Sequence, residues 1–204
     1  MTDNLTLQMR PPDEKSVWSS APPAQRPLLA LGVAEIRERL ASALAAGDGA
    51  AGAHCIHELW MRSALGVDID SELERLWKAA ARSIPEWLPT RYVDWLPLAY
   101  EIAESFTARR RGKSNIYLVL LDYRDRRDGP HGLYVGMSAY TPAERFDQHK
   151  AGIRSAGSVL KRGLEVLTGP TLHLQRIARA EAARIEVELA SRLSDAGLKV
   201  EGGH

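Results

Sequence analysis

Apolar side chains in the first half of the chain recur at the spacing of an α-helix. They repeat every four residues within Val33–Ala46, which predicts an amphipathic helix that ends at Gly47. Because an interior proline removes a backbone hydrogen bond, a helix that includes Pro97 must bend or begin late there. Three more helices are predicted on these grounds: one around His54–Trp60, one from Asp70 until Pro85, and one from a Thr90 cap to about Thr107.

The second half of the chain changes to short apolar runs of strand length. Ile116–Leu121 and Leu133–Met137 predict two strands, joined by a charged connection that is too long for a tight hairpin. Leu172–Leu174, where a polar residue separates two leucines, predicts a third strand. Leu198–Val200 is a candidate for a short return to the sheet, and the terminal segment 202–204 is expected to be a loose tail.

One helix start in this half is well specified. Thr141 suits the cap, Pro142 suits the first helical position, and Glu144 stands three residues after the cap. This pattern predicts a helix from Pro142 to Ala151, closed by Gly152. Two further helices are predicted, over Ser158–Leu167 and over Ala180–Leu193.

These elements predict an α+β fold, with a small three-stranded mixed sheet flanked by helices and preceded by an α-helical N-terminal region. The proline-rich start predicts a flexible arm, with Trp18 as the candidate to pin it. The expected segments are a flexible arm at 1–28, a helical domain at 29–108, a basic linker at 109–114 and a sheet-containing domain at 115–204.

Composition is that of a globular protein, with 204 residues of which 45% are hydrophobic and 26% charged. The start of the chain lacks the basic and apolar regions of a signal peptide, and no apolar run approaches a membrane helix in length. We therefore expect a cytoplasmic protein without a membrane partner. Cys55 is the only cysteine, which excludes an internal disulfide and a metal site built on several thiolates.

Charge divides unequally between the two halves. Residues 109–204 carry 17 Lys/Arg against 11 Asp/Glu, a net of +6, whereas residues 1–108 carry 10 against 15, a net of −5. A basic half indicates an anionic ligand. The linker that opens this half, with Arg111 and Lys113, is either a solvated connector or an arm that contacts phosphate.

All five tryptophans lie in the first half. Two interpretations are open. Buried aromatic residues usually serve packing, so they can simply fill a small helical core. Tryptophan is also enriched at binding hot spots, so they can instead form a surface for a protein partner.

The second half supplies the groups that phosphodiester hydrolysis requires. Such a reaction needs a base for the attacking water and positive charge for the phosphate oxygens. Tyr117 and Tyr134 are expected on neighbouring strands, and Arg145 and His149 are one helical turn apart on one face. Glu186 lies at the edge of the apolar stripe of the last helix, although Glu181 and Glu188 compete for the same role. Taken singly, Tyr117 and Tyr134 are explained as strand aromatics, and Arg145 and His149 as part of a solvated helix face.

The order of these groups resembles the GIY-YIG nuclease superfamily over about residues 114–204. Asn115-Ile116-Tyr117 stands in place of the first triplet and Tyr134-Val135-Gly136 in place of the second. Arg145-x-x-x-His149-x-x-Gly152 resembles the first helix of the family, and the segment 181–186 resembles the helix that presents a metal-binding glutamate. Two departures stand out: Asn115 replaces a glycine, and the asparagine often found near the family's C-terminal end has no counterpart after Leu198.

The resemblance implies an endonuclease that cuts nucleic acid, DNA rather than RNA, with one Mg²⁺ or Mn²⁺ ion. By the resemblance, Tyr117 helps to activate water, Tyr134 positions phosphate or water, Arg145 binds the scissile phosphate, His149 assists in proton transfer or phosphate contact, and Glu186 holds the metal. Candidates for further nucleic-acid contact are His131, Lys150, Lys161, Arg111 and Lys113. Two alternatives stay open: a nucleic-acid-binding module without catalysis, and a protein-interaction adaptor that acts through the tryptophan-rich half.

Overall fold

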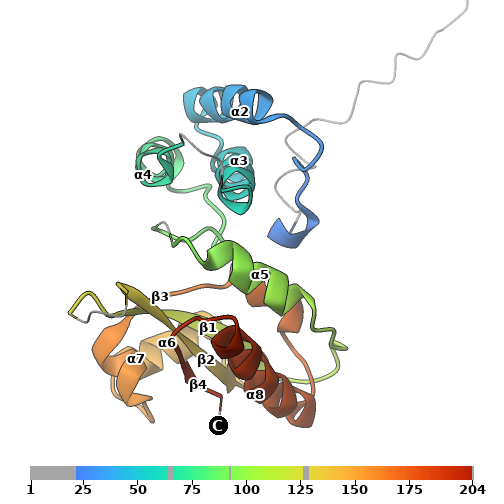
Figure 1. Ribbon diagram of the computed structural model, residues 1–204, viewed down its shortest axis with the longest axis vertical. Coiled ribbons are helices and arrows are strands. Elements are labelled where there is room, and N and C mark those ends of the chain that lie inside the picture. Colours follow the sequence, from blue (N-terminus) through green and yellow to red (C-terminus); the bar gives the residue numbers. More distant parts are fainter. Residues whose placement is uncertain (1–21, 64–66, 92, 126–128, 204) are drawn as a thin grey trace, which may run out of the picture.

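The structure is a computed structural model that describes residues 22–63, 67–91, 93–125 and 129–203. A small sheet carries α8 on one side and α6 with α7 on the other, and α5 lies between the sheet and the remaining helices (Figure 1). No helix in these ranges is both long and apolar enough to cross a membrane. The elements are η1 (Pro23–Gln25), α2 (Val33–Ala46), α3 (Gly49–Met61), α4 (Ile69–Ala80), α5 (Leu96–Glu104), β1 (Asn115–Asp122), β2 (His131–Ser138), α6 (Pro142–Lys150), α7 (Gly157–Arg162), β3 (Gly163–Val166), η2 (Gly169–Leu174), α8 (Arg179–Asp195) and β4 (Val200–Gly202).

The sheet has the strand order β3-β1-β2-β4. β1 pairs antiparallel with both β2 and β3, and β2 pairs parallel with β4. The expected α+β class with a mixed sheet flanked by helices is therefore confirmed. The expected number of three strands is wrong, because the sheet has four.

The third strand does not lie where the alternation of leucines placed it. Leu172–Leu174 belongs to the 3₁₀ helix η2, whose first turn contains Pro170. The strand at the β1 edge is β3, Gly163–Val166, which falls inside a segment predicted to be helical. Every residue of β1 up to Leu121 is buried, so its backbone needs hydrogen bonds from a strand on each side. That tertiary demand overrides the local helical pattern, and α7 ends at Arg162.

The C-terminal segment is part of the sheet. Val200–Gly202 forms β4 and pairs with Leu133–Val135 of β2. The expectation of a return to the sheet near Val200 is therefore confirmed, and the expectation of a loose tail is wrong for Gly202. His204, which belongs to the same expectation, lies outside the described residues.

Two helices of the first half, α2 and α5, follow the sequence pattern, but the predicted cap of α5 does not. α2 has the bounds that the apolar spacing predicts. α5 begins only at Leu96, with Pro97 in its first turn, so the expected late start is confirmed. Thr90 does not cap it, because the backbone N–H and the hydroxyl of Thr90 both donate to Glu165 of β3.

The two faces of the sheet carry different cores. Ile116, Leu118 and Leu120 of β1 belong to a large apolar cluster that also contains buried residues of α2–α5 and α8. Successive residues of a strand point to opposite faces. Tyr117 and the next two odd-numbered residues of β1 therefore lie on the other face, in a smaller cluster with Val159 of α7. The helical region and the sheet thus share one core, and the second face is left for α6 and α7.

The segment that follows the expected arm is docked rather than free. Leu28 is buried in the large core, and Arg26 donates two hydrogen bonds to the buried carboxylate of Glu58. Arg62 donates to the same carboxylate. A flexible arm is therefore wrong for residues 23–28, because these contacts hold them. Trp18 lies outside the described residues.

Three of the four tryptophans in the described ranges, Trp60, Trp87 and Trp95, belong to the large apolar core or pack against it. None of the four is exposed. Trp60 is fully buried and its indole N–H donates to the carbonyl of Val93 at 3.0 Å. Trp87 contacts the rings of His54 and His57.

Glu58→Gln is expected to lower the free energy of unfolding by about 2 kcal/mol at pH 7, since charge-assisted hydrogen bonds are worth that much. Burial alone would raise the pKa of Glu58, but the hydrogen bonds from Arg26 and Arg62 hold this pKa below its ordinary value. A carboxyl whose folded pKa is lowered contributes stability above its unfolded pKa and loses it as pH falls. The difference between wild type and variant should therefore shrink in acid, as measured by urea unfolding at pH 7 and pH 3.

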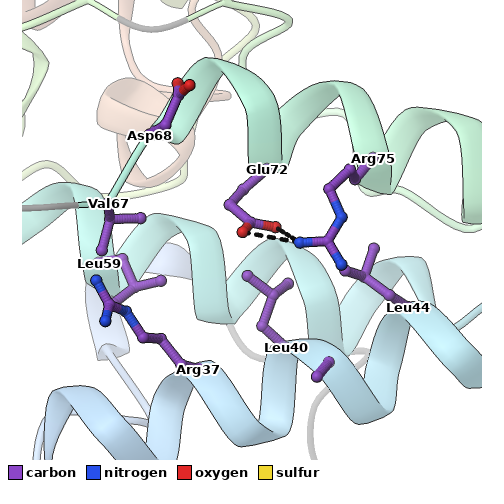
Figure 2. Close-up of a pocket in the computed structure, with 9 residues that line it drawn as sticks. Arg37, Leu40, Leu44, Leu59, Val67, Asp68, Glu72 and Arg75 are labelled. Carbon is purple, nitrogen blue, oxygen red and sulfur yellow. Dashed lines mark hydrogen bonds and ion pairs between the residues drawn. The ribbon is translucent and has the colours of Figure 1, made fainter.

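Glu72→Gln is the matched control, because Glu72 also pairs with an arginine one turn away, Arg75, but at the surface (Figure 2). A surface pair contributes little, so this change should lower the free energy of unfolding by less than about 0.5 kcal/mol. Equal losses in the two variants would contradict the importance of the buried pair.

Candidate active site

The register of β1 against β2 brings the two tyrosines together. Tyr117 stands opposite Gly136, and Tyr134 stands opposite Val119, so the two tyrosines are diagonal neighbours on one face. Their ring centroids are 6.0 Å apart. The expectation that both face the same helix is confirmed, because both rings also contact His149 of α6.

Gly136 is the reason that both rings fit on this face. A Cβ atom on this residue would lie 2.6 Å from the hydroxyl of Tyr117 and 2.7 Å from the ring of Tyr134. These distances are shorter than side-chain contacts allow, so any larger residue would displace one of the rings.

Helix α6 supplies Arg145 and His149. Its start is fixed by the predicted capping box, in which Thr141 and Glu144 bond each other's backbone N–H. His149 is 0% exposed, whereas Arg145 is half-buried. The two therefore share a helical face as predicted, but only Arg145 remains within reach of solvent.

The hydrogen bonds of His149 define which nitrogen carries the proton. Nδ1 accepts the backbone N–H of Ala156 at 3.0 Å. Burial, assisted by the positive charge of Arg145, lowers the pKa of His149 to about 4, so the ring is neutral at pH 7. The single ring proton must then be on Nε2, which donates to the hydroxyl oxygen of Tyr117 at 2.9 Å.

Tyr117 in turn is linked to Tyr134. Burial raises the pKa of both phenols. A hydrogen bond between the two hydroxyls raises the pKa of Tyr117 further and acts to lower that of Tyr134, which is the effect expected when Tyr117 is the donor. Since Tyr117 is 1% exposed and Tyr134 is half-buried, the chain His149–Tyr117–Tyr134 leads from the interior to the surface.

Arg145 is fixed at the rim of this chain. Its guanidinium donates to the carbonyls of Ile153 and Arg154, at 3.3 and 2.8 Å, and to the side chain of Gln148. Its positive charge acts to lower the pKa values of Tyr117 and Tyr134. An arginine held in this way presents a fixed charge to an anion.

Glu186 reaches the same end of the sheet from α8. It is 8% exposed, and its Oε1 accepts the backbone N–H of Met137 at 2.9 Å. β4 pairs with β2 only as far as Val135, so the carboxylate takes the place of a strand beyond that point. Its negative charge acts to raise the pKa of Tyr134. Glu188, by contrast, pairs with arginines of its own helix.

These residues fit one particular kind of metal site. In the described part of the chain, no group of three or more His, Cys, Asp or Glu residues could hold a metal ion. Zinc needs such a group. Mg²⁺ is often held by one or two carboxylates, with water and substrate phosphate completing its shell. Glu186, as a carboxylate beside the tyrosines, fits that second kind of site.

The remaining predicted residues divide by position. His131 lies opposite Asp122, at the far end of the strands from Tyr117. Lys161 lines a charged hollow with residues of that same far end. Lys150 donates to the carbonyls of Leu160 and Gly163, so it ties α6 to α7 and β3. These three are therefore not part of the site. Arg111 and Lys113 precede β1, at the end where the site lies.

Two contributors to the site, Asn115 and Ala156, were not expected from the sequence. Asn115 donates to the carbonyl of Tyr140 and accepts the N–H of Arg176, so a side chain joins segments at the position where the family has glycine. Ala156 contributes through its backbone N–H, so its residue type gives no indication of this role in the sequence. Glu201, near the C-terminal end where the asparagine of the family has no counterpart, stands opposite Tyr134 in β4.

Two hollows differ in what they offer. The hollow beside Tyr134 is lined by Ala156–Ser158 and Val200–Gly202, and it opens the site to solvent. The other lies on the helical region, where its acidic residues already have local partners: Asp68 caps α4 and Glu72 pairs with Arg75 (Figure 2). Its lining residues are Arg37, Leu40, Ala41, Leu44, Leu59, Val67, Asp68, Glu72 and Arg75. Only the first hollow adjoins a cluster of potentially reactive groups.

Comparison with known proteins identifies no relative. No protein-family model matches the chain, and no curated protein and no solved structure is significantly similar to it.

Gly136→Ala is expected to lower the free energy of unfolding by about 2 kcal/mol, because the added methyl group overpacks the space between the two tyrosine rings. Gly157→Ala is the matched control beside the same hollow, since a Cβ atom there meets nothing within 4 Å. Urea unfolding measures both. A Gly136 variant as stable as the Gly157 variant would contradict the close packing of the rings.

The ring of His149 is expected to titrate near pH 4 in the folded protein, which ¹H–¹³C NMR of the ring carbons can follow. A histidine whose pKa is lowered by folding takes up its proton at a lower pH in the folded state than in the unfolded state. Stability is therefore lost as pH falls from about 6.5 towards 4. His149→Gln, which also identifies the resonance, should reduce that loss. Titration of His149 near pH 6.5 would rule out the buried neutral ring.

Proposed function

We propose that this protein is a divalent-metal-dependent endonuclease that hydrolyses phosphodiester bonds in nucleic acid, DNA rather than RNA. The observation that carries the proposal is the convergence of five groups at one end of the sheet. Tyr117 and Tyr134 come from two strands, Arg145 and His149 from α6, and Glu186 from α8. These are the residues on which the resemblance to the GIY-YIG superfamily rests.

The site offers a separate group for each requirement of the reaction. A water oxygen forms a bond to phosphorus while the bond to the leaving oxygen breaks, and the water loses a proton. Arg145 is the group for the negative charge on the phosphate oxygens. Tyr134 is the tyrosine that solvent reaches, so we assign to it the contact with the attacking water.

Tyr117 and His149 act as positioning residues. His149 is fully buried and neutral, so it contacts neither phosphate nor bulk water. Its N–H donates to Tyr117, and this bond orients the Tyr117 hydroxyl towards Tyr134. Tyr134 acts as its phenolate, after its own proton has passed to bulk solvent, and accepts the proton that the attacking water loses. The donated hydrogen bond and the charge of Arg145 stabilise this phenolate.

Glu186 would hold the metal ion. A bound divalent cation supplies charge that stabilises the phosphate oxygens and the leaving oxygen. The carboxylate is already oriented for such a role, because its bond to Met137 fixes it against the sheet edge.

A second candidate function is nucleic-acid binding without cleavage. The raised pKa values of Tyr117 and Tyr134 favour it, since a phenol that holds its proton at pH 7 is a weak base. Cleavage and binding must therefore be measured separately.

The test is cleavage of supercoiled plasmid DNA and of an RNA transcript with Mg²⁺ or Mn²⁺, compared with EDTA. Wild type is expected to cut DNA only when metal is present. Glu186→Gln should reduce the rate about 100-fold or more, because the ion loses its protein ligand. Glu188→Gln, on the same helix, should cut like wild type because its carboxylate serves surface ion pairs.

Three outcomes separate the possibilities. Equal cleavage by wild type and the Glu186 variant would assign the activity to another site or to a contaminant. Binding of DNA without cleavage in any metal would favour the binding module. Preferential cleavage of the transcript would identify RNA, and not DNA, as the substrate.

A further inference from the structure

Cations differ across the molecule in whether they have acidic partners. In the described part of the helical region, five of the cations form ion pairs with carboxylates: Arg26, Arg62, Arg75, Lys78 and Arg91. Several cations of the second half form no such ion pair among the described residues, and six of these lie shortly before β1 or at the start of α8: Arg109, Arg110, Arg111, Lys113, Arg176 and Arg179. These six, called here the anchor cluster, lie in two segments that are about 65 residues apart in sequence and contain no acidic residue.

Backbone hydrogen bonds join the two segments of the anchor cluster. Ser114 and Ile177 exchange both of their N–H···O bonds, at 3.1 and 2.9 Å, as an antiparallel pair does. The N–H of Gly112 donates to the carbonyl of Arg176 at 2.8 Å. A Cβ atom on Gly112 would lie 2.0 Å from the carbonyl oxygen of Ile177, so only glycine permits this approach. The segment predicted to be either a solvated connector or a phosphate-contacting arm is therefore held against residues 176–177.

The alternation of this short ladder directs the cations outward. Ser114 and Ile177 are buried, whereas their neighbours Lys113 and Arg176 are exposed. Successive residues of extended chain point to opposite sides. Counted back in twos from Tyr117, Lys113 belongs to the sheet face that carries the tyrosines. The backbone N–H of Arg176 donates to the side chain of Asn115, which belongs to the same face.

We propose that the anchor cluster is a binding surface for the phosphate backbone of a nucleic-acid duplex, beside the candidate active site. Cations without acidic partners are available to neutralise phosphates and release counterions. Lys113 precedes Tyr117 by four residues, which places it about 13 Å away along extended chain. That is about four base pairs of duplex, at about 3.4 Å each. The cluster would hold the substrate a few nucleotides from the bond that is cut.

The position of this surface relative to the cleaved bond rests on the proposed function. Binding of nucleic acid to the surface can be tested without cleavage. The test variant replaces Arg111, Lys113, Arg176 and Arg179 by glutamine. The control variant replaces four cations elsewhere by glutamine, so both lose the same charge; the control positions are Arg75, Lys78, Arg82 and Arg184. Fluorescence anisotropy then measures the affinity of wild type and both variants for 20-base-pair DNA and RNA duplexes in EDTA, from about 50 to 200 mM salt.

The anchor variant is expected to bind the preferred duplex about 10- to 100-fold more weakly than wild type at about 100 mM salt. The slope of log K against log salt should fall in magnitude by about 3 to 4, since each lost phosphate contact removes about 0.9. The control variant should bind within about threefold of the wild-type affinity, and its slope should equal that of wild type. Circular dichroism of all three proteins checks that folding is unchanged.

The outcomes distinguish this surface from the nuclease. Loss of affinity and slope in the anchor variant alone supports the surface, even if no metal produces cleavage. Wild-type affinity and slope in the anchor variant would overturn the surface, even if the Glu186 variant has lost cleavage. Equal losses in both variants would also overturn it, because binding would then depend on net charge rather than on these positions. The two duplexes show whether the backbone recognised is that of DNA or RNA.

Discussion

The antiparallel register of β1 against β2 is the constraint on which the candidate site depends. It sets Tyr117 opposite Gly136 and diagonal to Tyr134, and the missing side chain of Gly136 leaves the space that the two rings occupy. A slip of one residue would turn one of the two strands over, so that one tyrosine would face the apolar core beneath α5 and α8 while the other stayed on its present face. The pairing that builds the sheet therefore also orders the reactive groups above it.

Burial decides what the grouped residues can do. His149 lies fully inside, and its lowered pKa keeps it neutral, so it serves as a fixed hydrogen-bond donor to Tyr117. Exposure increases from His149 through Tyr117 to Tyr134, and Arg145 and Glu186 bring opposite charges to the outer end of that chain. The proposed division between positioning residues and residues that contact substrate follows from this gradient of solvent access.

The distribution of ion pairs complements the site. Most cations in the described part of the helical region form ion pairs with carboxylates, as Arg26 and Arg62 do with Glu58. Those that surround the start of β1 are left without such partners in the described chain, and a glycine brings their two segments together. A net charge of +1 for the whole chain conceals this contrast, because the acidic and basic halves nearly cancel.

The sequence alone determined the elements whose signals are local. The capping box of Thr141 and Glu144 set the start of α6, four-residue spacing set α2, and short apolar runs of strand length set β1 and β2. Tertiary structure decided the rest. β3 formed inside a predicted helix because the buried edge of β1 needed hydrogen bonds, and the proton position on His149 follows from a backbone N–H that no residue type reveals. Short-range patterns encode local conformation, whereas the edge of a sheet and the exposure of a side chain depend on what packs there from elsewhere in the chain.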